Sequence, residues 1–194
     1  MPHHTIYFVR HGQTDWNVEL RYQGQMDIPI NETGRGQAAG NGRTLKTLID
    51  DHEKWRFIAS PLGRTRETME IIRKQFGLSA HGYEIDDRLK EITDGLWEGY
   101  THAELEAAHT KDVDRRDADK WNFRPPNGES YAMLYERVKS WLRHIEQDAI
   151  VVTHGGVLRV LDHHFLGTPG LEAVHKSVPQ DRIFKWDGTD ARWQ

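Results

Sequence analysis

The sequence contains no cysteine among its 194 residues, and no apolar run approaches the length of a membrane-spanning helix. The first absence excludes disulfides, thiolate metal sites and thiol nucleophiles, and it is compatible with a reducing cytoplasm. The second argues against a membrane partner, since a spanning helix needs ~20 apolar residues. The segment Met1–Thr5 lacks the charged and apolar regions of a signal peptide. We therefore expect a cytoplasmic protein.

Charge of one sign is not concentrated anywhere in the chain. The formal net charge is only −4, and neither basic nor acidic residues form a long block. A basic stripe that could neutralise a nucleic-acid backbone is missing, so we expect no nucleic-acid partner. Hydrophobic residues make up 37% of the sequence and include seven tryptophans, which is enough for a packed core. Residues 1–194 are expected to form a single domain.

Short apolar runs alternate with amphipathic stretches along the chain. The clearest strands are expected at 5–9, 56–60 and 149–153, with weaker ones at 82–86 and 182–186. Apolar residues at three- and four-residue steps predict helices over 33–49, 62–76, 130–145 and 157–166. This alternation indicates an α/β fold with a mostly parallel central sheet. Residues 101–121 predict a strongly charged helix, and the turn at 124–128 ends a helical excursion spanning about 100–128.

Histidine and arginine residues follow the three clearest strands. Arg10 and His11 end the first, Arg64 comes shortly after the second, and His154 follows the third directly. Ligands of open α/β sheets bind at the carboxyl ends of the strands, where loops and helix N-termini converge. We therefore expect these four side chains to meet at one edge. The glycine after His154, Gly155, permits a tight turn and also aims a backbone N–H at an anion.

Two arginines and two histidines in one pocket favour a phosphate ligand. The guanidinium group presents a planar fork of donors that matches a tetrahedral dianion. One histidine, His11, can attack phosphorus as a neutral imidazole that flanking arginines keep uncharged, while His154 donates to the growing negative charge. Glu91 is the candidate that gives a proton to the leaving alcohol, although Asp94 or Glu98 could do so instead.

Structural alternatives exist for these residues. Arg64 could pair with Glu67 or Asp86 on a helix surface, and Glu91 could pair with Arg88 or Lys90. Adjacent histidines such as those at 163–164 lack the i, i+4 spacing of a zinc site, and no carboxylate cluster suggests a metal. We therefore expect neither a metal nor another cofactor.

The run Arg10–Asn17 resembles the signature of the histidine phosphatase superfamily, which includes the cofactor-dependent phosphoglycerate mutases and many small phosphatases. Further matches, in chain order, are Gln23–Gly24 with Asp27, Ser60–Thr68, Leu89–Gly99, Gly128–Ser130 and Val152–Gly156. The resemblance implies a three-layer, phosphoglycerate-mutase-like sandwich. It implies a nucleophile at His11, a phosphate pocket of Arg10, Arg64 and His154, a further phosphate contact at Asn17, a proton donor at Glu91, and substrate-side contacts at Gln23 and Gly24.

Three functions remain open at this point. The favoured one is metal-independent hydrolysis of a small phosphorylated metabolite through a phosphohistidine. A phosphoglycerate mutase is the first alternative, but the resemblance implies Arg-His-Tyr after the acid of mutases, where this chain has Ile92-Thr93-Asp94. The pair Arg115–Arg116 could hold a substrate carboxylate as in mutases, or form a salt-bridged surface with neighbouring aspartates. The second alternative is a non-catalytic module that binds a phosphorylated ligand. The sequence leaves the substrate and the oligomeric state, including a homodimer, undecided.

Overall fold

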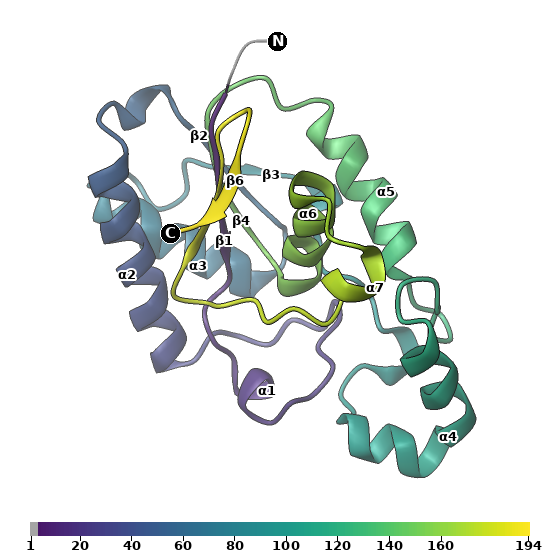
Figure 1. Ribbon diagram of the computed structural model, residues 1–194. Helices are drawn as coiled ribbons and strands as arrows, with labels where there is room; N and C mark the ends of the chain where they lie inside the picture. The colour runs from purple at the N-terminus through teal and green to yellow at the C-terminus, as the bar shows by residue number, and fades with distance from the viewer. Residues whose placement is uncertain (1–3) are drawn as a thin grey trace.

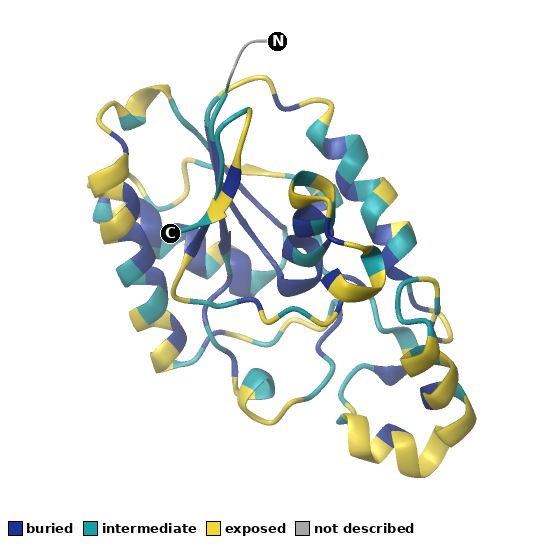
Figure 2. Cartoon of the chain, viewed as in Figure 1, coloured by how far each residue is buried: buried dark blue, intermediate teal, exposed yellow. Residues whose placement is uncertain are grey.

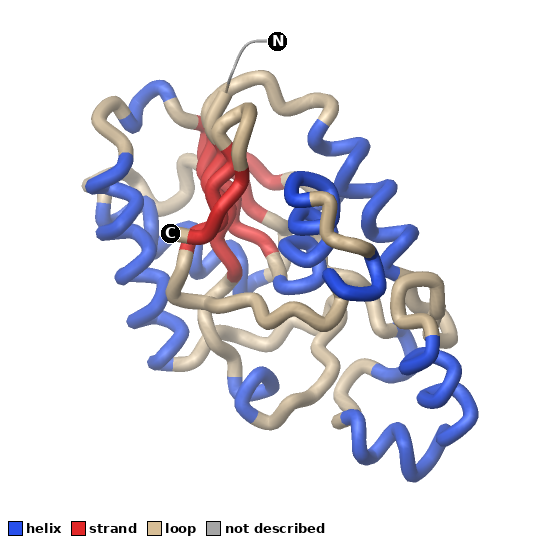
Figure 3. Tube along the Cα trace, in the orientation of Figure 1, coloured by secondary structure: helices blue, strands red, loops and turns tan. Residues whose placement is uncertain are grey.

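A six-stranded sheet forms the centre of the computed structural model, which describes residues 4–194 (Figure 3). Its strand order is β3-β2-β4-β1-β5-β6. The strands are β1 (Ile6–Arg10), β2 (Arg56–Ala59), β3 (Glu84–Ile85), β4 (Ala149–Thr153), β5 (Ile183–Trp186) and β6 (Ala191–Trp193). The first four run parallel, whereas β5 pairs antiparallel with β1 and β6 antiparallel with β5. The predicted mostly parallel α/β sheet is confirmed.

Helices cover both faces of the sheet and complete the three-layer sandwich (Figure 1). One face carries α2 (Glu32–Leu48) and α3 (Gly63–Gln75), and the other carries α5 (Tyr131–Leu142), α6 (Gly155–Leu166) and the short α7 (Gly170–Ala173). Alternate residues of β1 divide between the two cores: Ile6 and Phe8 pack toward α5 and α6, and Tyr7 and Val9 pack toward α2 and α3. A strand covered on both faces is apolar throughout, which explains the continuous apolar run in the sequence.

The excursion stands apart from the sandwich. Helix α4 (His102–Ala118) is mostly exposed (Figure 2), and its backbone breaks at His109. Leu105 and Val113 attach it to a small core around Trp97. The predicted helix over 101–121 therefore exists, but it is shorter and kinked.

Most of the predicted elements lie within a few residues of their expected bounds, and several short elements were not predicted. Helix α5 ends at Leu142, before the predicted 145. The missed elements are α1 (Asp15–Val18), α7, β6 and the 3₁₀ turns η1 (His52–Lys54), η2 (Asp87–Leu89) and η3 (Gly95–Trp97). Within residues 4–194, no helix combines the length and apolarity needed to cross a membrane.

The carboxyl ends of β2, β4 and β1 lie side by side because β4 pairs with both neighbours. Backbone hydrogen bonds continue one residue past the strands, from His11 N to Thr153 O at 2.9 Å and from Ser60 N to Val152 O at 3.1 Å. The loops after these strands lie at the same end of the molecule as α1 and α4 (Figure 1). The predicted convergence of the strand ends is confirmed.

Candidate active site

A cavity of about 510 Å³ opens at this edge of the sheet. Among the predicted site residues, those lining it are Arg10, His11, Asn17, Gln23, Gly24, Arg64 and Glu91. His154 and Gly155 are not among the lining residues; both are buried, and they lie behind His11 and Arg10 respectively. The predicted set is thus brought together, with two members in the wall instead of at the surface of the cavity.

His11 is held with one ring nitrogen fixed and the other free. Its Nδ1 lies 2.8 Å from the carbonyl oxygen of Gly12. A carbonyl oxygen can only accept, so Nδ1 carries the proton and Nε2 keeps its lone pair. The ring is only 2% exposed. Burial, reinforced by the positive charges of Arg64 and Arg10, holds the pKa of His11 well below its usual value. The ring is therefore neutral, and burial contributes more to this than the arginines.

His154 packs directly against His11, with their ring centroids 5.3 Å apart. It is fully buried at the N-cap of α6, and its Nε2 lies 2.7 Å from Oγ of Ser60. Its Nδ1 is buried and has no hydrogen-bond partner among residues 4–194. Burial and the nearby charge of Arg64 lower the pKa of His154 well below its usual value.

The two arginines are fixed by backbone carbonyl groups. Arg64 is fully buried and donates to Gly24 O at 2.7 Å and Met26 O at 2.6 Å. Arg10 donates to Val178 O at 2.7 Å, and burial lowers its pKa to about 10, so it stays charged at neutral pH. The alternative partner Glu67 pairs instead with Arg35 at 2.8 Å. Both guanidinium groups thus have donors left for a ligand.

Glu91 lies at the N-terminus of α6. Its carboxylate accepts from the N–H of Gly156 at 3.1 Å and from that of Ile92 at 2.9 Å. A Cβ at position 156 would collide with this carboxylate, which explains the second glycine after His154. The alternative partners are engaged elsewhere: Arg88 with Asp86 at 2.6 Å and Lys90 with Asp87 at 2.9 Å.

The two other candidate acids differ in position. Glu98 is a structural group: its Oε1 accepts from Gln25 N, Thr93 Oγ1 and Asp94 N, and it does not line the cavity. Asp94 does line the cavity. Burial, together with the charge of Glu91, raises the pKa of Asp94 to about 7.

A further residue that positions this site, Gln180, was not predicted from the sequence. Its Nε2 donates to His11 O at 3.1 Å and to Asn17 Oδ1 at 3.0 Å. The backbone N–H of Thr14 donates to the same Oδ1 at 3.1 Å. Two donors on one atom fix the Asn17 amide, so its Nδ2 is left to donate. Gln180 lies in the irregular segment between α7 and β5, where no periodicity or motif signals it.

The substrate-side candidates Gln23 and Gly24 form part of the wall. Gly24 adopts a φ of +46°, which favours glycine, and this turn directs its carbonyl toward Arg64. The Oε1 of Gln23 is buried and has no partner.

The sequence model of the histidine phosphatase superfamily (branch 1) matches residues 6–194. The chain belongs to the histidine phosphatase superfamily. A relative from Erwinia tasmaniensis, named "Probable phosphoglycerate mutase GpmB", is 35% identical, covering 97% of this chain and 86% of the relative. The structure of YhfR from Bacillus stearothermophilus is 31% identical with a TM-score of 0.79, covering 97% of this chain and 94% of that one. The resemblance stated from the motifs is confirmed.

A mycobacterial glucosyl-3-phosphoglycerate phosphatase shares the fold at 24% identity, with a TM-score of 0.79 over 99% of this chain and 96% of that one. Superfamily membership supports an enzyme, as does the name of the Erwinia tasmaniensis relative, a probable mutase. Across the described part of the chain, no group of three or more His, Asp or Glu side chains is arranged to hold a metal ion.

The raised pKa of Asp94 predicts a pH-dependent gain in stability for Asp94→Asn. Between its unfolded pKa near 3.8 and its folded pKa of about 7, the folded state holds a proton that the unfolded state has lost. The stability of the parent protein therefore falls as pH rises through this window, by at most about 1.4 kcal/mol per pH unit from this group. In denaturant titrations from pH 4 to 8, the free energy of unfolding of the variant, relative to that of the parent, should rise with pH up to pH 7. A constant difference would contradict this burial effect.

Proposed function

We propose that the chain is a phosphomonoester hydrolase that acts on a small phosphorylated metabolite through a phosphohistidine at His11. The observation that carries this proposal is the free Nε2 lone pair of a neutral, buried ring beside two guanidinium groups with unused donors. Cationic donors fixed in advance stabilise the charge that develops on phosphate oxygens. This arrangement supplies positioning and charge stabilisation from side chains alone, which supports a metal-independent reaction.

The reaction has two steps. In the first, Nε2 of His11 forms a bond to phosphorus while the bond to the leaving oxygen breaks, and protonated Glu91 gives that oxygen its proton. In the second, Glu91 takes a proton from water, whose oxygen displaces His11 from phosphorus and releases inorganic phosphate. Arg10, Arg64 and the Nδ2 of Asn17 hold the phosphate oxygens, with His154 as a further donor.

Glu91 acts as the acid in the first step and as the base in the second. Two backbone N–H groups fix its carboxyl group at the N-terminus of α6. A phosphate dianion held beside it repels a second negative charge, so the complex with substrate favours the neutral carboxyl group that the first step requires.

A mutase is the second candidate, favoured by the named relative and by the position of Arg116. The structure separates the basic pair: Arg115 is exposed and bonds to Asp112 at 3.2 Å, whereas Arg116 lines the cavity. Both arginines pair with a neighbouring aspartate, Arg116 with Asp117 at 3.0 Å, but only Arg115 lies on the exposed surface. Hydrolysis remains favoured because Ile92-Thr93 stands where the resemblance implies Arg-His in mutases.

The three functions predict different products from purified protein in excess chelator. We expect phosphate release from p-nitrophenyl phosphate, with less than about twofold change on addition of EDTA because the proposed reaction uses no metal. With 3-phosphoglycerate and bisphosphoglycerate, free phosphate should appear faster than the 2-isomer. Faster isomer formation would establish the mutase. Absence of turnover over a broad panel of phosphate esters, with binding retained, would establish the non-catalytic module.

A further inference from the structure

The cavity has a second group of basic side chains besides Arg10 and Arg64. Its cations are Lys120, just after α4, Arg159 on α6, and Arg116 on α4, and all three line the cavity. None of them has a part in the reaction described above. Fixed cations that face a ligand cavity without a catalytic task are candidates for recognising the rest of the substrate.

Lys120 and Arg159 are held by neutral groups. Lys120 Nζ donates to Val174 O at 3.1 Å. Arg159 donates through Nε to Lys176 O at 3.0 Å and through NH1 to the hydroxyl of Tyr131 at 3.2 Å. Throughout residues 4–194, neither cation forms an ion pair with a carboxylate. Each therefore keeps charged donors for a ligand.

The other charges around the cavity are already matched. Arg21 pairs with Glu19 and Glu104, and Glu129 pairs with Arg137. Arg116 bonds to Asp117 at 3.0 Å, so it contributes less free charge than the other two. Arg10 and Arg64 offset a phosphate dianion in the proposed complex. The positive charge of Lys120 and Arg159 then remains.

The remaining carboxyl groups in the cavity offset little of this charge when substrate is bound. Glu91 enters the proposed reaction as the acid and so adds no negative charge, and Asp94, with a pKa of about 7, is only partly ionised at neutral pH. Burial and the like charges of Arg116 and Arg159 lower the pKa of Lys120 to about 8. An anion placed among these cations would relieve their repulsion and keep Lys120 charged.

We propose that Lys120 and Arg159 form a second anion-binding subsite, and that the substrate is a phosphomonoester carrying a second acidic group. This inference rests on the proposed function and narrows its substrate class. The acidic group is a carboxylate or a second phosphate, since ammonium and guanidinium groups bind both. The cavity, at about 510 Å³, has room for both ends of such a molecule.

The test compares matched esters with and without the second acid. Suitable pairs are 3-phosphoglycerate with glycerol 3-phosphate, and phosphoglycolate with ethyl phosphate; a sugar bisphosphate beside its monophosphate tests a second phosphate. We expect the acidic member of at least one pair to have the higher kcat/KM. Lys120→Met and Arg159→Met should each lower kcat/KM for the preferred acidic ester by roughly 10- to 100-fold, the range for a lost charged hydrogen bond. For neutral esters, each substitution should change kcat/KM by less than about threefold.

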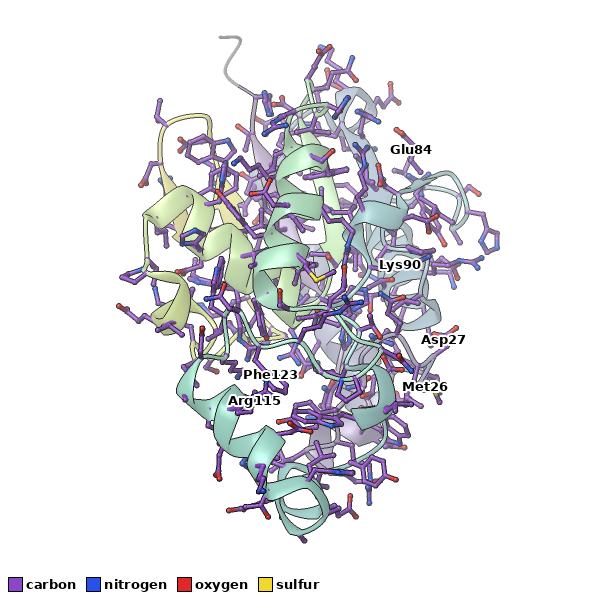
Figure 4. All side chains as sticks on the ribbon, turned by 90° about the vertical axis from the view of Figure 1, so that its right-hand side faces the viewer. Met26, Asp27, Glu84, Lys90, Arg115 and Phe123 are labelled. Carbon is purple, nitrogen blue, oxygen red and sulfur yellow. The ribbon has the colours of Figure 1, made fainter. Side chains whose placement is uncertain are left out.

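The neighbouring Arg115 supplies a matched control. It has the same charge as Arg116, its side chain is 74% exposed, and it does not line the cavity. Figure 4 labels Arg115, which lies on α4, and Phe123 in the lower part of the molecule. Arg115→Met should leave kcat/KM unchanged for both members of every ester pair. Arg159→Lys, which keeps the charge, should recover part of the preference if Arg159→Met folds poorly.

Two outcomes would overturn the subsite. The first is a wild-type enzyme with no preference for any acidic ester, and the second is a fall in kcat/KM that is equal for acidic and neutral esters in the variants. Failure of the proposed function is distinguishable, because it appears as no turnover of any ester. In that case calorimetric titration of the same esters measures the acidic-to-neutral affinity ratio directly. A ratio above one that collapses in Lys120→Met supports the subsite, and a ratio unaffected by that substitution refutes it.

Discussion

Replacing His11 with alanine is expected to abolish phosphate release, lowering kcat by on the order of 10⁴-fold or more, as loss of a nucleophile does in other covalent enzymes. The substitution removes a neutral ring that lines the cavity with a free Nε2 lone pair beside two guanidinium groups. Arg10, Arg64 and Glu91 would remain, so substrate binding should weaken much less than turnover. Steady-state kinetics with an aryl phosphate, together with titration of inorganic phosphate binding, measures the two effects separately.

A trapping experiment gives the same prediction a chemical signature. Rapid denaturation of the wild type during turnover should leave phosphorus bound to His11, labile in acid and stable in alkali, and His11→Ala should yield none. His81→Ala is the matched control, because that ring is 77% exposed and does not line the cavity. Normal turnover in His11→Ala, or bound phosphorus at another residue, would rule out the proposed nucleophile.

The position of the proposed nucleophile was predictable because strand ends in a parallel sheet share an edge. Arg10 ends β1, which pairs with β4 so that Arg10 lies opposite Thr153, and His11 and His154 come directly after these two strands. The apolar runs predicted those strands, and their alternation with helices predicted the parallel arrangement. The protonation state of His11 was also predicted from the arginines, but its largest cause is burial, which no local pattern reveals.

The remainder of the site depends on contacts between distant segments. Gln180 lies in an irregular segment, and it reaches Asn17 only because β5 returns the chain antiparallel to β1. Helix α1 and strand β6 are too short for periodicity to indicate them. Arg115 lies on the surface and Arg116 lines the cavity because of the way α4 is oriented against the rest of the protein. The sequence does not give this orientation, so it could not show which of the two arginines faces the cavity.

Glu91→Gln is expected to have effects that depend on the leaving group. An alkyl alcohol needs a proton to leave, so kcat for alkyl phosphates should fall by roughly 10²- to 10⁴-fold, the usual contribution of a general acid. p-Nitrophenolate leaves without a proton, so phosphorylation of His11 by p-nitrophenyl phosphate should stay fast. Attack of water then lacks its base. The variant should release about one equivalent of p-nitrophenol in a burst and then turn over slowly.

Asp94→Asn decides between the two candidate acids that line the cavity, Glu91 and Asp94. Asp94 has the raised pKa expected of an acid, but Glu91 is held by Gly156 at the end of α6, beside the phosphate pocket. We therefore expect Asp94→Asn to show no burst and to change kcat for alkyl phosphates by less than about tenfold, well below the effect of losing a general acid. A burst in Asp94→Asn and none in Glu91→Gln would transfer the acid role to Asp94. Position would then matter less in this cavity than a pKa set by burial, because proton transfer favours a group that titrates near the working pH.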